Sequence, residues 1–323
     1  MNVASLFSGA GGLDLGFIEA GHKIVWANDN YEDAVLTYKR NVGDHITLSD
    51  IKDIDCSDIP DHDILIGGFP CQGFSVANTK RHAEDSRNQL YLEFLRVLSN
   101  KKPNFFVAEN VKGILSLEKG AVFEMILSDF SKAGYKVEYQ VLNAANFGIP
   151  QKRERVIIIG IKNDLDISIK HPLPTHAEQK NLFNRLEPWV TVQQAVNDLP
   201  DPDGDHSLLN HTYSKFKLKF NGYIGNRRID PDKPAPTVTA RGDSKGGVVV
   251  LHHPNNKRRM SVRELATIQS FPMDFEFIGT NSSCYRQIGN AVPPLLAYHI
   301  GKQFPVNLTQ NEYENTKEAV SQL

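Results

Sequence analysis

A cysteine that follows a buried-strand pattern is the first feature of the sequence with chemical potential. The residues from Ile64 to Gly73 read ILIGGFPCQG, which places Pro70 and Cys71 just beyond an apolar run. Proline restricts the backbone, and the glycines on both sides allow a sharp turn and the close approach of a flat ligand. A thiolate is a strong nucleophile where its surroundings favour deprotonation. Cys71 is therefore a candidate nucleophile, although a lone cysteine is more often a small buried hydrophobe.

One carboxylate and two arginines follow other apolar runs. Glu109 closes the run NFFVAEN, and Arg153 and Arg155 alternate within QKRER. A pyrimidine ring is an electrophile that matches this set, because sulfur can add to C6 while glutamate neutralises charge at N3. Arginine can hold the ring O2 and a phosphate. C5 then becomes nucleophilic toward a sulfonium methyl group, and a ring inside a duplex must be flipped out to be reached.

A glycine-rich turn near the start of the chain indicates the cofactor. The residues LFSGAGGLDLG follow the apolar run 3–7 and lead into a helical pattern. A dinucleotide fingerprint has a third glycine where this chain has Asp14. An acid there disfavours a pyrophosphate and tolerates an ammonium group, such as that of the methionine end of S-adenosylmethionine. Asp29, at the end of KIVWAND, could bind ribose hydroxyls in either case. The loop alone leaves an NAD(P)-dependent oxidoreductase open, and Asp14 and the Pro-Cys loop argue against it.

Strands and helices alternate over the first 160 residues. Apolar runs predict strands at 3–7, 23–29, 63–69 and 104–110 and two late strands at 135–143 and 155–162, while helical spacing predicts helices at 13–21, 31–41, 88–100 and 121–134. This order predicts an α/β fold with a doubly wound, mostly parallel sheet and helices on both faces. Ligands of such sheets bind beyond the carboxyl ends of the strands, where Asp29, Asp50, Cys71 and Glu109 fall.

The later chain has a different texture. Residues 170–257 are rich in Pro, Asn, Gly and His, which predicts a small loop-rich domain, and helical patterns return at 261–272 and 295–304. Between His206 and Arg263 twelve Lys/Arg face three Asp/Glu, so this stretch carries +9 and the rest of the chain −11. The asymmetry favours a polyanion-binding region on an acidic body. A solvated basic face would explain the charges equally well.

Composition narrows the class of protein. The chain has 323 residues, of which 40% are hydrophobic and 23% charged, as in ordinary globular proteins. We expect a cytoplasmic protein, because no run of about eighteen apolar residues and no secretory signal pattern is present. The three cysteines show no spacing typical of a zinc site, so no metal is expected.

Six segments, in order, resemble the motifs of the cytosine-5 DNA methyltransferase family of bacterial restriction–modification systems. They are LFSGAGGLDLGF (6–17), GFPCQGFS (68–75), ENV (109–111), QKRER (151–155), RRMSVRELATIQSFP (258–272) and QIGNAVPP (287–294). The resemblance implies that Cys71 is the nucleophile, Glu109 the partner of N3, Arg155 the ligand of O2 and Arg153 a ligand of the flipped nucleotide's phosphate.

The resemblance also implies S-adenosylmethionine as cofactor. Its pocket would comprise Phe7, Ser8, Gly9, Gly11, Gly12, Asp29, Asp50, Ile51, Pro70, Leu90, Asn290 and Val292. Two residues depart from the family pattern. Asp29 stands where glutamate is more frequent, and Asn30 stands where some members place an aromatic side chain over the cofactor.

The implied organisation is a catalytic and cofactor-binding domain (1–172), a target-recognition domain (173–257), a hinge helix region (258–289) and a return to the catalytic domain (290–323). Double-stranded DNA is the expected partner of a monomeric enzyme that protects host DNA from a restriction endonuclease. The candidate DNA contacts are Arg227, Arg228, Arg241 and Lys245, because arginine can pair with guanine and basic side chains contact phosphates. A catalytically silent DNA-binding relative is the second alternative, which the intact set of Cys71, Glu109 and Arg155 argues against.

Overall fold

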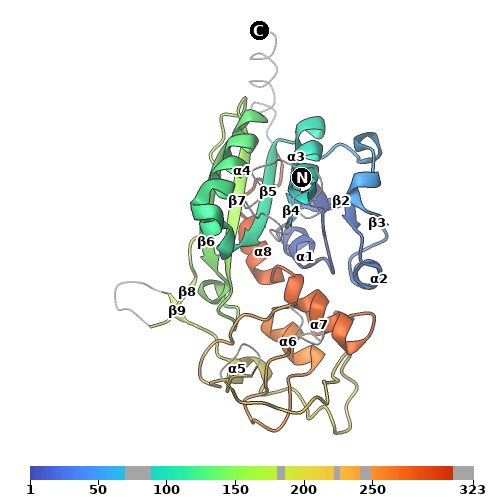
Figure 1. Cartoon of the computed structure of the whole chain (residues 1–323), viewed down its shortest axis with the longest axis vertical. Coiled ribbons are helices and arrows are strands. Elements are labelled where there is room, and N and C mark those ends of the chain that lie inside the picture. Colours follow the sequence, from blue (N-terminus) through green and yellow to red (C-terminus); the bar gives the residue numbers. More distant parts are fainter. Residues whose placement is uncertain (70–88, 180–185, 222–225, 241–248, 308–323) are drawn as a thin grey trace.

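A seven-stranded sheet in the order β3-β2-β1-β4-β5-β7-β6 forms the upper part of the molecule in Figure 1. The structure is a computed structural model and describes residues 1–69, 89–179, 186–221, 226–240 and 249–307. The strands of the sheet are β1 (Asn2–Leu6), β2 (Lys23–Asp29), β3 (Ile46–Leu48), β4 (Ile64–Gly67), β5 (Phe105–Val111), β6 (Tyr135–Asn143) and β7 (Glu154–Lys162).

The prediction of a doubly wound, mostly parallel sheet is confirmed. Strands β1 to β5 pair in parallel, whereas β7 is antiparallel to both β5 and β6. The reversal at β7 follows from the connection between β6 and β7, which contains only the short 3₁₀ helix η4 (Ala144–Phe147). A parallel pairing would need a crossover of a dozen or more residues.

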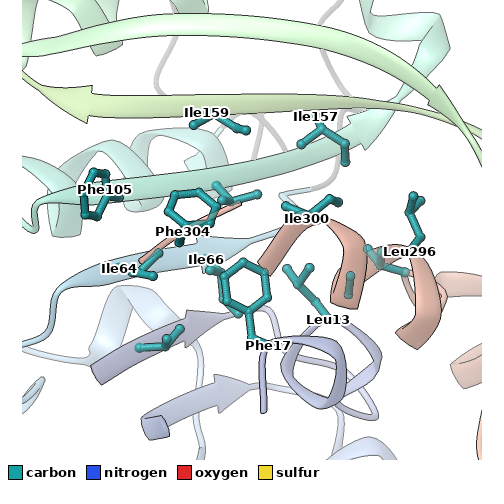
Figure 2. Close-up of a cluster of buried hydrophobic side chains, with 14 of the residues drawn as sticks. Leu13, Phe17, Ile64, Ile66, Phe105, Ile157, Ile159, Leu296, Ile300 and Phe304 are labelled. Carbon is teal, nitrogen blue, oxygen red and sulfur yellow. The ribbon is translucent and has the colours of Figure 1, made fainter. Parts of the chain in front are cut away.

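Helices cover both faces of the sheet. They are α1 (Gly12–Glu19), α2 (Glu32–Asn41) and α8 (Pro294–Gly301) on one face, and α3 (Gln89–Lys101) and α4 (Ala121–Lys132) on the other. Successive strand residues point to opposite faces, so Ile64 and Ile66 pack with α1 and α8, while Leu65 packs with α3 and α4. Figure 2 shows Phe17 of α1 and Ile300 of α8 in one cluster with Ile64 and Ile66 of β4. The sheet is thereby buried on both sides, and its carboxyl edge stays available for a ligand.

A second hydrophobic core lies below the sheet in Figure 1 and contains α5 (Val192–Val196), α6 (Val262–Ile268) and α7 (Asn281–Asn290). We call these helices and the loops packed on them the second lobe. A capping box begins α6, because Ser261 Oγ accepts from the backbone N–H of Glu264 and the Glu264 side chain accepts from the backbone N–H of Ser261. Ala10 of the glycine-rich turn packs into the core of this lobe, so the turn connects both cores.

The remaining elements are short. They are the 3₁₀ helices η1 (Ile51–Asp53), η2 (Cys56–Asp58) and η3 (Lys112–Gly120) and the two-residue strands β8 (His176–Ala177) and β9 (Glu187–Pro188). Within the described part of the chain, no helix has the length and apolar character needed to cross a bilayer. The same residues contain no cluster of three His, Cys, Asp or Glu side chains that could hold a metal ion.

Candidate active site

A cavity of about 490 Å³ opens at the carboxyl ends of β1, β2, β4 and β5. The first turn of α1 and the end of α7 close it from the side of the second lobe. Most of the site residues predicted from the sequence line it. Those near the glycine-rich turn and the adjoining strands are Phe7, Ser8, Gly9, Gly12, Asp29, Asp50, Ile51, Leu90, Asn290 and Val292, and those beyond β4 and β5 are Glu109, Arg153 and Arg155.

Several predicted residues do not belong to this lining. Gly11 is the N-cap of α1 and packs toward Tyr38. Pro70, Cys71, Arg241 and Lys245 lie outside the described residues. The approach to Cys71 is described, because Phe69 lines the cavity and its carbonyl accepts a 2.8 Å hydrogen bond from Asn110 Nδ2.

The glycine-rich turn reverses the chain between β1 and α1. Phe7, Gly9 and Gly11 all have positive φ angles, of 55°, 55° and 88°. Such angles cost little at glycine and more at phenylalanine. The turn is held by the Ser8 N–H, which donates to Asn28 O at 2.9 Å. This strained turn places the backbone of 8–12 along the cavity wall.

Asp29 braces the turn from the end of β2. Its Oδ2 accepts from the Gly9 N–H and its Oδ1 from the Tyr31 N–H, each at 2.8 Å. Burial raises its pKa above the ordinary value. Asp50 plays a similar local part at the end of β3, where its Oδ1 accepts from the Lys52 N–H at 3.1 Å and begins η1. Both carboxylates are fixed in direction before any ligand arrives.

Asp14 does not face the cavity, which corrects the role expected from the sequence. The residue is fully buried, and its carboxylate accepts from Ser5 Oγ and from the Tyr38 hydroxyl, each at 2.7 Å. Tyr38 in turn lies 3.0 Å from His45 Nε2. Because the side chain points under the glycine-rich turn, it cannot meet an ammonium group of a ligand directly.

Glu109 and Arg155 form an ion pair inside the cavity. Glu109 belongs to β5, and Arg155 lies near the start of the neighbouring strand β7. Arg155 Nε lies 2.8 Å from Glu109 Oε1. Each side chain is 11% exposed. Arg155 also donates from Nη1 to Glu154 O at 2.8 Å. The pair presents one acid and one fixed cation to the same space, which suits recognition of a ring with adjacent N3 and O2 atoms.

The Arg153 guanidinium binds backbone carbonyls of the protein and is not directed outward as a ligand of a phosphate would be. Its side chain is 1% exposed. Nη1 donates to Val238 O at 2.8 Å, and Nη2 donates to Gly289 O and Ala291 O at 2.9 and 2.8 Å. Three backbone carbonyls thus hold the guanidinium, and we assign Arg153 a structural role in this geometry. The partners of Arg153 come from segments distant in sequence, so the pattern QKRER alone could not indicate them.

The cavity lining also contains residues that the sequence analysis did not single out. Tyr31 and Arg286 both line the cavity, and the Arg286 guanidinium lies 5.5 Å from the centre of the Tyr31 ring. The Tyr31 hydroxyl is 2.6 Å from Ser283 Oγ of α7. Arg286 stands one helical turn before Asn290, a signal that becomes visible only once α7 is recognised as a helix.

Much of the basic charge of 206–263 is used inside the second lobe. The internal bonds include Lys215 to Asp203, Lys233 to Asp230, Arg258 to Glu264, Arg259 to Val250 O and Arg263 to Leu209 O and Pro272 O. Arg227 and Arg228 are exposed, and the Arg228 guanidinium lies over the Phe220 ring at 4.8 Å. The charge asymmetry therefore has both a structural and a surface component.

Comparison with known proteins identifies the family. The family model for C-5 cytosine-specific DNA methylases matches residues 1–305. The type II methyltransferase M.NgoFVII of Neisseria gonorrhoeae is 42% identical over 315 residues, which cover 90% of this chain and 83% of the relative. M.MthTI of Methanothermobacter thermautotrophicus is 36% identical over 334 residues, covering 95% and 98% of the two chains.

Solved structures share the fold. The structure of a candidate DNA modification methyltransferase encoded within an E. coli prophage superposes with a TM-score of 0.74 at 28% identity, covering 94% of this chain and 98% of that chain. The S. pombe Dnmt2 methyltransferase gives a TM-score of 0.66 at 20% identity, covering 93% and 97%, and supports the fold alone. Matches of this extent decide against the oxidoreductase alternative. The chain belongs to the C-5 cytosine-specific DNA methylase family and is a DNA (cytosine-5-)-methyltransferase.

Proposed function

We propose that the chain transfers a methyl group from S-adenosylmethionine to C5 of a cytosine flipped out of a specific duplex DNA site, through a covalent bond between Cys71 and C6. The observation that carries the proposal is the Glu109–Arg155 ion pair, which shares one cavity with the glycine-rich turn. Phe69, two residues before Cys71, lines the same cavity. Groups suited to a pyrimidine and to a nucleoside cofactor therefore share a cavity with Phe69, which precedes Cys71 by two residues in the sequence.

The cavity residues fit S-adenosylmethionine. Its volume of about 490 Å³ lies within the range of small-ligand pockets. Asp29 offers carboxylate oxygens suited to ribose hydroxyls, and the apolar side chains of Ile51, Leu90 and Val292 suit a flat adenine ring. The backbone N–H groups at the start of α1 favour a carboxylate. When bound, S-adenosylmethionine supplies the electrophilic methyl group that C5 takes up.

Each protein group then has a defined task. The Cys71 thiolate adds through Sγ to C6, and the electron pair of the C5–C6 double bond shifts toward C5 and, through C4, toward N3 and O2. Glu109 hydrogen-bonds to N3 and Arg155 to O2, which stabilises the charge that develops on the ring. After methylation a base removes the C5 proton, and the returning electron pair expels the Cys71 thiolate. Asn110 holds the Phe69 carbonyl, two residues before the nucleophile in the sequence.

The second lobe is proposed to read the DNA site. Residues 173–257 would form the target-recognition domain, in which Arg227 and Arg228 are exposed and to which Arg241 and Lys245 would also contribute. The enzyme would act as a cytoplasmic monomer, and its methylation would protect host DNA from a restriction endonuclease. Taking the cytosine out of the stack costs a few kcal/mol, which phosphate contacts from this lobe can offset.

Bisulfite sequencing of a plasmid from cells that express the chain tests the proposed reaction. We expect complete protection of one cytosine within a short recurrent site, and no protection in cells that express Cys71→Ser. A plasmid that converts fully would support the catalytically silent alternative. Protection that persists in Cys71→Ser would retain the methyltransferase and exclude the thiol adduct.

Trapping tests the covalent bond directly. A duplex that carries 5-fluorocytosine at the methylated position should form a stable complex with the protein, because fluorine does not leave as a proton does. Intact-mass spectrometry with added S-adenosylmethionine should show protein plus DNA plus one methyl group. The Cys71→Ser protein is the matched control, and a mass of free protein alone from the wild type would contradict the adduct.

A further inference from the structure

A buried polar junction joins the second lobe to the cavity wall, and its centre is Arg153. We call the side chains of Gln151, Arg153 and Gln269, with the carbonyls that they bind, the clasp. All three side chains are at most 1% exposed. A buried guanidinium that binds only carbonyls is costly to retain unless its position serves a purpose.

The first side of the clasp is the backbone of residues 235–240. Residues 150–152 and Ala235 pair like two strands, with the Ala235 N–H donating to Pro150 O and the Lys152 N–H donating to Ala235 O, each at 2.8 Å. The Val238 N–H donates to Gln151 Oε1 at 2.9 Å, and Val238 O accepts from Arg153. The backbone of 235–238 is thereby fixed to the start of β7.

The second side is the turn after α7, which closes the cavity. Arg153 binds Gly289 O and Ala291 O. Gln269 donates from Nε2 to Ile288 O and Ala291 O at 2.9 and 2.8 Å, and its Oε1 accepts from Gln151 Nε2. One guanidinium and one amide thus hold the turn whose residues Asn290 and Val292 line the cavity.

The two sides also touch directly, with no room to spare. A methyl group at Gly289 would lie 2.3 Å from Ala240 N and 2.4 Å from the carbonyl carbon of Thr239. A methyl group at Gly12 would lie 2.4 Å from Val292 O. A continuous series of contacts therefore runs from 238–240, through 289–292, to the first residue of α1.

We propose that Arg153 is a positioning residue that couples DNA binding by the second lobe to cofactor binding in the cavity. Its guanidinium fixes the backbone of 238–240 relative to that of 289–291. A ligand that restricts the motion of one segment therefore also restricts the motion of the other. This inference rests on the proposed function for the identity of the two ligands, whereas the clasp itself is independent of it. Linkage requires that each ligand raises the affinity for the other by the same factor.

Hydrogen exchange of the ligand-free protein tests the clasp itself. Arg153→Lys keeps the charge but cannot reach three carbonyls at once. We expect amide exchange to rise by about tenfold in both 235–240 and 288–292, and the same result for Gln269→Leu. Arg263→Lys is the matched control, because Arg263 is fully buried and also binds three carbonyls but does not line the cavity. An increase confined to one segment, or an equal increase in the control, would overturn the proposal.

Binding measurements test the coupling. The affinity for S-adenosylhomocysteine is measured by calorimetry with and without a duplex that contains the site found by bisulfite sequencing. The duplex should tighten this binding in the wild type and in Arg263→Lys, and Arg153→Lys should lower the coupling factor at least about fivefold. An unchanged coupling factor would refute the role of Arg153. Loss of the proposed function would instead appear as absence of cytosine methylation, with the exchange result intact.

Discussion

Asp14 is a buried carboxylate whose side-chain partners among the described residues are two hydroxyl groups and not a cation. Ser5 and Tyr38 donate hydrogen bonds to it, yet burial outweighs them and raises its pKa from 3.8 to about 6. The folded state therefore holds the Asp14 proton more tightly than the unfolded state does. The stability that this proton contributes is complete below about pH 4 and is lost as the pH rises through about 6.

The resulting prediction concerns the pH dependence of stability. Relative to Asp14→Asn, the free energy of unfolding of the wild type should fall by about 2–3 kcal/mol between about pH 4 and pH 7, since one pKa unit corresponds to about 1.4 kcal/mol. Urea unfolding followed by the fluorescence of the buried Trp26 measures it. Tyr38→Phe removes a hydrogen bond that lowers the Asp14 pKa, so its decrease should occur at higher pH. Parallel curves for wild type and Asp14→Asn would contradict the buried-charge account.

At this scale the sequence predicted positions better than orientations. Asp29, Asp50 and Glu109 were placed correctly at the cavity, because each lies within two residues of the carboxyl end of a strand and the carboxyl ends of parallel strands share one edge. Asp14 and Arg153 were also located near the cavity, but their partners come from tertiary packing. No local sequence pattern could reveal that the Tyr38 hydroxyl binds Asp14 or that the Ala291 carbonyl binds Arg153.

The close contact between the start of α1 and the turn after α7 predicts the effect of a substitution at Gly12. Gly12 begins α1, where alanine would be a better helix former than glycine, but a β-carbon there would lie 2.4 Å from Val292 O. Gly12→Ala should therefore push the returning segment out of the cavity and weaken S-adenosylhomocysteine binding by about tenfold or more, or about 1.4 kcal/mol. Calorimetry measures the affinity.

Gly113→Ala is the control for that substitution. A β-carbon at Gly113 would have no atom within 4 Å among the described residues, so binding and stability should both be retained. The melting temperature of Gly12→Ala should also fall, because the same displacement loosens the packing of α8 against α1. Unchanged affinity in Gly12→Ala would mean that the returning segment does not help to hold the cofactor.

The elements missed by the sequence analysis have a physical explanation. The pattern of α7, NSSCYRQIGN, is polar and begins with three poor helix formers. It is stabilised instead by the Thr280 N-cap and by the packing of Cys284, Tyr285 and Ile288 in the core of the second lobe. The antiparallel direction of β7 was also not predicted, because apolar runs indicate burial and not strand direction.

Some of the basic side chains of the molecule bind groups within the protein, and others are exposed at its surface. The stretch 206–263 carries +9, and composition alone could not separate the buried cations from the exposed ones. Arg258 is paired with Glu264 and Arg263 with backbone carbonyls, so neither is free to meet a polyanion. Arg227 and Arg228 are exposed, and so are Lys217, Lys219 and Lys257, so DNA binding can depend on these described cations.

The salt dependence of DNA binding measures the contribution of Arg227 and Arg228. If Arg227 and Arg228 each neutralise one phosphate, Arg227→Gln/Arg228→Gln should reduce the slope of log Kd against log salt concentration by about 2, because each contact contributes about 0.9. Lys102→Gln/Lys132→Gln removes the same charge from exposed residues near the amino ends of β5 and β6, at the sheet edge opposite the cavity. This control should leave the slope unchanged. Equal slopes for all three proteins would place the DNA-binding surface elsewhere, whereas an equal reduction in both variants would indicate a response to net charge alone.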